Sequence, residues 1–392
     1  MTIEDFQREV EVMFPCRWEE DFVRDVQKVF DIYISLVSAL EEIEEGVIGE
    51  IKALCTTLSD VLELYYDGRK GEAYMMFSTI MNGDAETEGL FASIGNVEVN
   101  PEELYYRARE RKIGENFSII DMFHIPLNKR GIVSTQRYSS PGYPCLYLGN
   151  TVYSCWEELR RIPFDNLMFS AYKVKYAFKV FDMRVPNDSD YSPEKLVQTI
   201  KRVPLMLACS FVVKNSSDVF KPEYIIPQML VETIISNNRK ITQLDKSKMD
   251  PNVIWGVIYT STHVSNDFPY GKMFLENIVL PVIESNTTSH YCYFLASLFE
   301  ISRPSCYEYE SLKDNPSRIY MYKFDQEKTE EEVLQEQYNR SKMGYLEKKL
   351  KNSPFEILPH IMVGCPNEGI TLDWTGSPIC CEVRASDNFT IE

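Results

Sequence analysis

Apolar residues recur with a helical period over the first 90 residues. Between positions 22 and 47 they stand alternately four and three residues apart, which is the spacing of an a/d seam. Further periodic runs cover residues 51–65 and 73–81, and Asp67-Gly68 separates the two. We therefore predict an α-helical domain over residues 1–90, organised as a three-helix bundle.

The seam of the first predicted helix has two interpretations. Gly46 and Gly49 are expected to end or bend this helix. The seam either forms the core of the bundle, beneath a solvated acidic face, or provides a surface for a second copy or another protein. Its residues are Phe22, Val26, Val29, Tyr33, Leu36, Leu40, Ile43 and Val47.

Short alternating and apolar runs, typical of strands, dominate the chain from residue 104 onwards. Residues 172–180 place aromatic and β-branched side chains on one face of a strand and lysines on the other. Helical stretches separate and follow such runs, so we predict the α+β class. The predicted strands are 104–109, 145–148, 172–180, 205–213, 254–261 and 277–281, and the predicted helices are 194–200, 223–236 and 327–350.

The net charge of −18 is concentrated in the N-terminal part. Residues 1–99 hold 7 Lys and Arg against 22 Asp and Glu, and the rest is close to neutral. This charge distribution shows no basic face, which argues against nucleic acid as a partner. The chain has no signal-peptide pattern and no run of about 18 apolar residues, so we expect a cytoplasmic protein that does not associate with a membrane.

Ten cysteines are spread along the chain without a CxxC motif, and we expect them to be reduced and buried. The nearest approach to a metal cluster combines His360, Cys365, Cys380 and Cys381. Adjacent cysteines suit tetrahedral zinc poorly, because consecutive strand side chains point in opposite directions. We therefore expect no metal.

Residues 137–159, which read RYSSPGYPCLYLGNTVYSCWEEL, concentrate the candidate chemistry. Arg137 precedes a turn, a short strand then carries Tyr147, and Thr151 is placed to cap a helix through Glu158. Tyr147 lies ten positions after Arg137, and Glu158 lies eleven positions after Tyr147. A guanidinium, a phenol and a carboxylate thus fall within 22 positions.

This segment resembles the RES-domain family, which is named for its Arg, Glu and Ser. The family pattern is an Arg, a Gly-x-Pro turn, a Leu-Tyr-Leu strand and a helix that bears a Glu. Here the matching residues are Arg137, Gly142-Tyr143-Pro144, residues 146–148 and Glu158.

The resemblance extends on both sides of this segment, over roughly residues 103–283. The strand at residues 256–261 matches the Gly-aliphatic-x-Tyr-x-Ser strand of the family, so Ser261 takes the place of its Ser. Residues 277–281 resemble the closing strand of the family. Arg107 matches the Arg that ends the first strand, and Arg109 is expected on the same face two residues on.

The resemblance implies a domain organisation. It implies an ADP-ribosyltransferase-like RES domain over residues 100–285 and an N-terminal helical domain, similar to HEPN bundles, over residues 1–90. Residues 286–392 form a C-terminal extension of unknown role. The first histidine of the chain is His124, so the Arg and His pair of HEPN nucleases is not expected. We interpret His124 as structural, with contact to a ligand as the alternative.

The resemblance also implies a substrate, NAD, and an enzyme that cleaves its nicotinamide–ribose bond. Arg107 and Arg137 suit the diphosphate, because guanidinium groups pair bidentately with phosphate oxygens. Tyr147 suits the charged nicotinamide ring. The implied catalytic residues are Arg137, Tyr147, Glu158 and Ser261, and the implied NAD-binding residues are Arg107, Arg109, Tyr147 and Gln228.

Three choices stay open at this point. Glu157 competes with Glu158, although the spacing favours Glu158, and Gln228 fits a plain helix surface equally well. Water, phosphate or a protein or nucleic-acid acceptor would make the enzyme an NAD glycohydrolase, an NAD phosphorylase or an ADP-ribosyltransferase. A toxin or defence effector held by a protein antitoxin, with a homo-oligomer formed through the N-terminal helices, is the expected setting, and a non-catalytic nucleotide- or partner-binding protein is the alternative.

Overall fold

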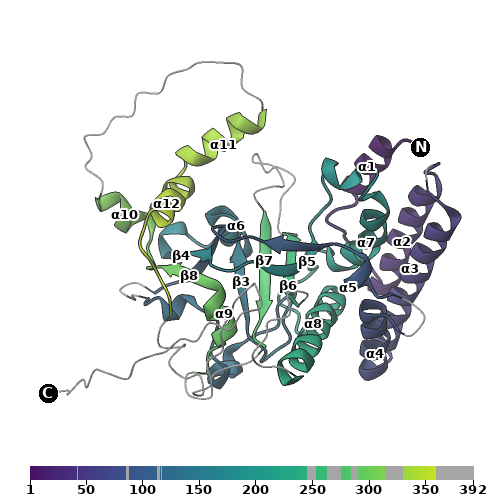
Figure 1. Cartoon of the computed structure of the whole chain (residues 1–392), viewed down its shortest axis with the longest axis horizontal. Helices are drawn as coiled ribbons and strands as arrows, with labels where there is room; N and C mark the ends of the chain where they lie inside the picture. The colour runs from purple at the N-terminus through teal and green to yellow at the C-terminus, as the bar shows by residue number, and fades with distance from the viewer. Residues whose placement is uncertain are drawn as a thin grey trace.

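The computed structural model describes residues 1–41, 43–84, 88–112, 115, 117–244, 253–262, 275–283, 290–313 and 330–358. One mixed sheet forms the centre of this part, with the N-terminal helices on one side and α10–α12 on the other (Figure 1). Its order is β1-β5-β6-β7-β3-β2-β4-β8-β9, in which β5 and β6 run parallel. The α+β class is thus confirmed. The strands are β1 Asn96–Val99, β2 Leu104–Glu110, β3 Cys145–Gly149, β4 Leu167–Val174, β5 Phe178–Met183, β6 Ile254–Thr260, β7 Glu276–Pro281, β8 Phe299–Ser302 and β9 Phe355–Glu356.

The sheet contains a long two-stranded antiparallel ribbon that is bent in the middle. Its two halves occupy distant places in the strand order. β1 pairs with β5 and β2 pairs with β4, while the chain passes directly from β1 to β2 and from β4 to β5. In the sheet order, β6, β7 and β3 stand between the β1–β5 pair and the β2–β4 pair, so the ribbon contributes strands on both sides of these three. The single strand predicted over residues 172–180 is therefore wrong. Its apolar alternation continues through the bend at 175–177 and does not reveal it.

Four helices cover the described residues 1–84, one more than predicted. The helix that carries the seam ends at Ser38, and the next begins at Glu45, so the predicted bend at Gly46 and Gly49 comes too late. The first helix, which contains few apolar residues, was not predicted. The four are α1 Ile3–Val12, α2 Phe22–Ser38, α3 Glu45–Tyr66 and α4 Lys70–Asn82.

Two long helices lie between the N-terminal helices and the sheet. They are α7, Leu196–Cys209, and α8, Ile225–Leu244. The strand predicted over residues 205–213 is wrong, because its first half continues α7. A short apolar run alone does not distinguish a strand from a buried helix, and nearly every residue of α7 from Val203 to Cys209 is buried.

A continuous apolar core joins the N-terminal helices to the sheet. α3 packs against α7, and α4 packs against α8. The core reaches residues of β5, β6 and β7, such as Phe181, Val257 and Val279. At its centre the hydroxyl of Tyr33 in α2, fully buried, donates a 2.7 Å hydrogen bond to the Ile200 carbonyl in α7. Most of the predicted seam is thus buried within the chain.

The C-terminal helices pack on the opposite part of the sheet. The single helix predicted over residues 327–350 is two helices, because Ser341 ends the first and caps the second through the Gly344 N–H. The second packs against β4 and α6. The helices are α9 Tyr293–Leu298, α10 Tyr307–Lys313, α11 Glu330–Arg340 and α12 Lys342–Lys351, and earlier in the chain α5 Leu90–Ser93 and α6 Val152–Glu158.

Short 3-10 helices complete the described structure at Ile120–Met122, Leu127–Ile132, Phe164–Asn166, Asp188–Tyr191 and Pro222–Tyr224. None of the helices in the described ranges combines the length and the apolar character that crossing a membrane requires.

Candidate active site

A cavity of about 360 Å³ opens where β2, β3 and α6 meet the segment 132–139. This volume is within the usual range of small-molecule sites. Four residues predicted for the site line it, three of them from one short stretch of the chain and one from β2. They are Arg107, Arg137, Tyr147 and Glu158, and their neighbours in the wall include Cys145, Cys155, Tyr224, Tyr259, Thr262 and Asn277.

Glu158 is the last residue of α6, and two donors hold its carboxylate at the cavity. Ser261 Oγ donates to Oε1 at 2.6 Å, and Asn277 Nδ2 donates to the same oxygen at 2.7 Å. Ser261 follows β6 and Asn277 lies in β7, so two neighbouring strands fix the position of one carboxylate. Ser261 therefore lies against Glu158 and does not line the cavity itself.

Glu157, the competing carboxylate, faces away from the cavity. It is buried and accepts hydrogen bonds from the Tyr153 hydroxyl and, at 3.0 Å, from Arg161 Nε. Successive helical residues are rotated by about 100°. Of the two carboxylates, only Glu158 therefore lines the cavity.

The start of α6 is fixed by a capping box. Thr151 Oγ1 accepts from the Ser154 N–H at 2.9 Å, and Ser154 Oγ accepts from the Thr151 N–H at 3.1 Å. Thr151 is thus the cap, as predicted, and the helix that it begins ends at Glu158. A Cβ at Gly149 would come within 2.4 Å of Ser154 Oγ, so glycine lets the end of β3 approach α6.

Arg137 is buried beside the cavity and donates to oxygen atoms at or just after the ends of α7 and β6. Its Nη1 donates to the Cys209 carbonyl at 2.8 Å, and its Nη2 donates to the Phe211 carbonyl at 2.9 Å and to Thr262 Oγ1 at 2.8 Å. The guanidinium also lies 5.5 Å from the centre of the Tyr224 ring. Among the described residues, no carboxylate forms an ion pair with it, so its charge stays available to an anion.

Gln228, in α8, lies outside the cavity wall and fastens the segment that carries Arg137. Its Nε2 donates to Thr135 Oγ1 and to the Gln136 carbonyl, both at 2.9 Å, and it lies 3.2 Å from the Ser139 carbonyl oxygen. Gln228 therefore acts on the loop rather than facing the space where a ligand would lie.

Tyr147 lines the cavity from β3, and its hydroxyl lies 3.1 Å from Ser139 Oγ. Burial raises the pKa of the Tyr147 phenol well above its ordinary value, so the ring is neutral. Tyr259 lines the same cavity, with its ring centre 4.6 Å from that of Tyr138. The aromatic side of the cavity thus offers neutral phenol rings.

The two arginines of β2 have different surroundings. Arg107 lines the cavity, and its Nη1 is buried without a hydrogen-bond partner among the described residues. Burial lowers the pKa of its guanidinium below the ordinary value. Arg109 does not line the cavity, because its guanidinium donates to the Asp121 carbonyl and lies 5.1 Å from the Phe117 ring centre.

The cysteines and the histidine near the cavity do not suit nucleophilic or acid–base roles. Burial raises the pKa of the Cys145 and Cys155 thiols to about 12, so both are protonated at neutral pH. His124 is buried, its Nδ1 lies 2.9 Å from the Ile125 carbonyl, and its Nε2 accepts from the Cys292 N–H at 2.9 Å. Burial lowers the pKa of His124 to about 4. His124 is therefore structural, as predicted.

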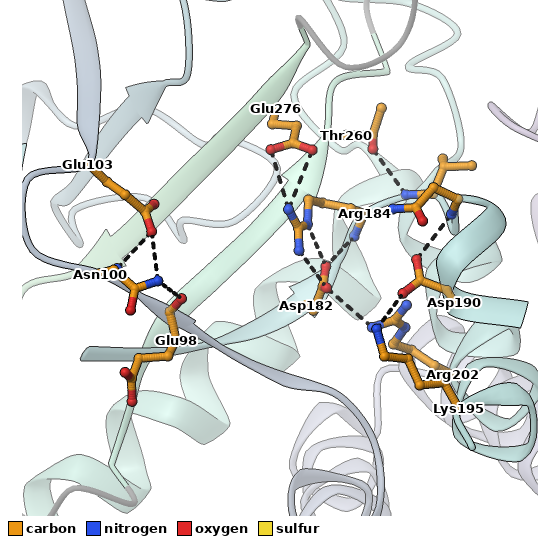
Figure 2. A network of polar contacts seen from close by, with 12 residues as sticks. Glu98, Asn100, Glu103, Asp182, Arg184, Asp190, Lys195, Arg202, Thr260 and Glu276 are labelled. Carbon is orange, nitrogen blue, oxygen red and sulfur yellow. Dashed lines mark hydrogen bonds and ion pairs between the residues drawn. The ribbon is translucent and has the colours of Figure 1, made fainter. Parts of the chain in front are cut away.

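A network of charges holds the strand ends that carry the two donors to Glu158 (Figure 2). Arg184, just after β5, donates to Asp182 at 2.9 Å and lies 3.5 Å from Glu276, which precedes Asn277 in β7. The Val185 N–H donates to Thr260 Oγ1 at 3.0 Å, and Ser261 follows Thr260. The network thus ties the ends of β5, β6 and β7 together.

The charges in this network are stabilised by their neighbours. Burial alone raises the pKa of the Asp182 carboxyl, but hydrogen bonds from Arg184 and the charge of Arg202 bring it below its ordinary value. Burial raises the pKa of Glu276. Asp182 is therefore negatively charged at neutral pH and forms the ion pairs with Arg184 and Arg202.

Several residues of the site were not predicted. Asn277 opens the predicted closing strand, and Tyr259 lies in the strand that ends at Ser261, but neither was assigned a contact with Glu158 or the cavity. Asn277 pairs with Gly149 of β3 on one side and with Tyr259 of β6 on the other, and this registry brings both residues to the cavity. Tyr224 and Thr262 carry no sequence signal that we can identify.

No group of three or more His, Cys, Asp or Glu residues in the described part of the chain could hold a metal ion. The cluster considered from the sequence, His360, Cys365, Cys380 and Cys381, lies outside the described residues.

Comparison with known proteins gives one family relationship. The chain is 30% identical over 328 residues to a protein of Bacillus subtilis (strain 168) named "Putative toxin YopC". The match covers 76% of this chain and 69% of that protein. No family model and no solved structure matches the chain.

Proposed function

Because this chain belongs to the family of YopC of Bacillus subtilis, we propose that it is a toxin, and specifically an enzyme that consumes NAD by cleaving the nicotinamide–ribose bond. The name of the relative supports the toxin role. The NAD chemistry is proposed from the cavity and from the resemblance of residues 103–283 to RES domains.

One observation carries the NAD proposal: Arg107, Arg137, Tyr147 and the α6 carboxylate of Glu158 line a single cavity. Arg107 and Arg137 have no carboxylate partners among the described residues, and Arg107 Nη1 is buried without any partner. Leaving buried positive charge unpaired is costly, so such a site favours an anionic ligand. A dinucleotide diphosphate supplies that charge.

The proposed reaction assigns a separate task to each of these residues. Cleavage of the bond develops positive charge on the ribose, and Glu158 would stabilise that charge from the wall of the cavity. Ser261 and Asn277 would hold the carboxylate before the reaction starts, so that little reorganisation is needed. Tyr147 offers a neutral aromatic face for the cationic nicotinamide ring.

The acceptor of the ADP-ribose group decides the name of the reaction. Water, phosphate and a protein or nucleic-acid group are all compatible with the residues described. A toxin that removes NAD needs restraint in the cell that makes it, and we propose a protein antitoxin as the partner that supplies it.

The first prediction tests the reaction through Glu158. Glu158→Gln keeps an oxygen that accepts from Ser261 and Asn277 but removes the charge. We expect release of nicotinamide from NAD to fall by a factor of about 100 to 1,000, with the thermal unfolding temperature unchanged. The measurement is chromatographic quantification of free nicotinamide, with and without phosphate.

Glu157→Gln is the matched control for this experiment. It alters the neighbouring carboxylate, which bonds Tyr153 and Arg161 away from the cavity. We expect it to reduce stability but to leave nicotinamide release per folded molecule within a few-fold of the wild type. Equal turnover by the wild type and Glu158→Gln would reject Glu158, and NAD retention without nicotinamide would select the non-catalytic binding protein.

A further inference from the structure

A carboxylate from the C-terminal helices lies at the start of the helix that carries Glu158. Glu347 of α12 accepts a 2.6 Å hydrogen bond from the Val152 N–H, and Val152 is the first residue of α6. The Tyr338 hydroxyl of α11 donates to the same Glu347 oxygen and accepts from the Tyr153 N–H at 3.4 Å. Two helices from the end of the described chain thus contact the first turn of α6.

These contacts complete the N-terminal hydrogen bonding of α6. A helix leaves its first four N–H groups without partners inside the helix. In α6 the first two bond to Glu347 and Tyr338, and the third bonds to Thr151 Oγ1. The fourth, from the N-cap residue Thr151, bonds to Ser154 Oγ at 3.1 Å. The C-terminal helices therefore supply half of the caps.

α6 is too short to hold its own position. It has seven residues, and helices of this length are unstable without tertiary contacts. Its two ends make different contacts. At the first end the Val152 N–H bonds to Glu347, and at the last end Glu158 lines the cavity. The helix is about 10 Å long, so a tilt or fraying at the first end displaces the carboxylate at the other.

The surroundings of Glu347 disfavour the charged form of its carboxyl group. Burial raises the pKa of the Glu347 carboxyl to about 7. The titratable groups that face it are the Tyr338 hydroxyl from α11, the Tyr106 hydroxyl from β2 and the Cys155 thiol from α6. Burial raises the pKa of each of these groups too, so they stay neutral, and no described cation forms an ion pair with Glu347. A buried carboxylate without a cation is hard to explain by stability alone.

We propose that Glu347, together with Tyr338, is a positioning residue for the reaction: it fixes α6 so that Glu158 meets the substrate in the correct place, which makes α11 and α12 part of the active site. The proposal rests on the proposed function. A displacement of about 1 Å at the reacting carboxylate costs on the order of a hundred-fold in rate.

The test compares Glu347→Ala, Glu347→Gln and the control Glu336→Ala in the full chain. Glu336 lies on α11 with its side chain 44% exposed, paired with Arg340. We expect Glu347→Ala to lower kcat for nicotinamide release at least tenfold with KM for NAD within about threefold of the wild type. Glu347→Gln keeps an acceptor for the Val152 N–H and should restore most of kcat, and the control should match the wild type.

A second readout does not depend on turnover. Amide hydrogen exchange of residues 152–158 should accelerate at least tenfold in Glu347→Ala and stay unchanged in Glu336→Ala. Unchanged exchange in Glu347→Ala, or kcat equal to that of the control, would overturn the positioning role. A wild-type chain that releases no nicotinamide would reject the proposed function instead, and hydrogen exchange would then decide whether Glu347 fixes α6.

Discussion

At the residue scale, Arg107 is the side chain whose environment most requires a ligand. Its Nη1 is buried without a partner among the described residues, although the side chain borders the cavity. Natural proteins seldom leave a buried charged donor unsatisfied, because the desolvation cost is not recovered. Burial of this charge therefore carries a cost in stability that a bound anion would relieve.

The second prediction follows from this cost. Arg107→Met removes the buried charge and keeps much of the side-chain volume, so the unfolding temperature should stay the same or rise. Loss of one charge-assisted contact should raise KM for NAD by about 10- to 100-fold. Thermal unfolding and nicotinamide release measure the two effects. A variant that unfolds more readily and binds NAD normally would contradict this account.

The sequence predicted which residues of the motif meet, but not what holds them. Arg137, Tyr147 and Glu158 lie close together in the chain, and a turn, a strand and a helix suffice to bring them to one cavity. The donors to Glu158 are different, because Ser261 and Asn277 lie 103 and 119 positions away. Their contact depends on strand registry, which local patterns do not contain.

At the element scale, Gln228 of α8 makes several hydrogen bonds to the segment that carries Arg137. Gln228 contacts Thr135, Gln136 and Ser139 through one nitrogen. Within the segment, Gln136 pairs with Ser139, and the Gly142 N–H donates to the Val133 carbonyl at 2.9 Å. Contacts with α8 therefore help to set the position of this segment.

The third prediction is that Gln228→Ala loosens this segment. Loss of these hydrogen bonds should reduce the free energy of unfolding by about 1–2 kcal/mol and reduce kcat/KM for NAD about tenfold. Urea unfolding and nicotinamide release check the two values. Asn237→Ala on the same helix is the control, because it removes one exposed bond to Asn82 and should change neither value appreciably.

The fourth prediction concerns the pH dependence that Glu347 gives to α6 and α12. Its pKa is about 7 in the folded chain, above the ordinary value of 4.5. The folded state therefore binds the proton more tightly, and stability is lost as pH rises from about 4.5 through 7. Relative to Glu347→Gln, the wild type should lose about 2 kcal/mol of unfolding free energy between pH 5 and pH 8.

Urea unfolding of both proteins at several pH values measures this difference. Glu336→Gln, which alters an exposed carboxylate, should show a nearly constant difference from the wild type over the same range. A constant difference for Glu347→Gln as well would show that Glu347 keeps an ordinary pKa in the folded chain.

Element types were predicted best where turn residues bounded them. The strand at 145–149 and the helix after Thr151 follow clear turn and cap residues, and both are observed. The run at 172–180 has no turn residue at its bend, and Pro204, which precedes the run at 205–213, lies inside α7 rather than at a strand boundary. Burial among other elements makes a helix such as α7 apolar on most sides, and a bend without Gly or Pro leaves the alternation intact.

At the scale of the whole molecule, the N-terminal helices and the sheet share one apolar core. Tyr33, Phe77, Ile200 and Val257 belong to the same buried cluster. The acidic charge of the N-terminal part lies on helices whose inner faces pack against α7 and α8. Formation of a homo-oligomer through these helices stays a prediction, since most of the seam is buried inside the chain.

The fifth prediction tests how far the rest of the chain depends on these helices. Removal of residues 1–84 exposes the apolar faces of α7 and α8, so the shortened chain should aggregate. Size-exclusion chromatography beside the full chain measures the soluble, monodisperse fraction. A soluble shortened chain that still releases nicotinamide would show that the helices fold and act as a separate domain.

The long separation between Glu158 and its two donors has a consequence for synthesis. While the chain is being made, the carboxylate emerges from the ribosome well before Ser261 and Asn277 exist. At ordinary translation rates the delay to Asn277 is on the order of ten seconds. During that interval the nascent polypeptide cannot hold Glu158 in place, so the site is complete only after residue 277 has been made.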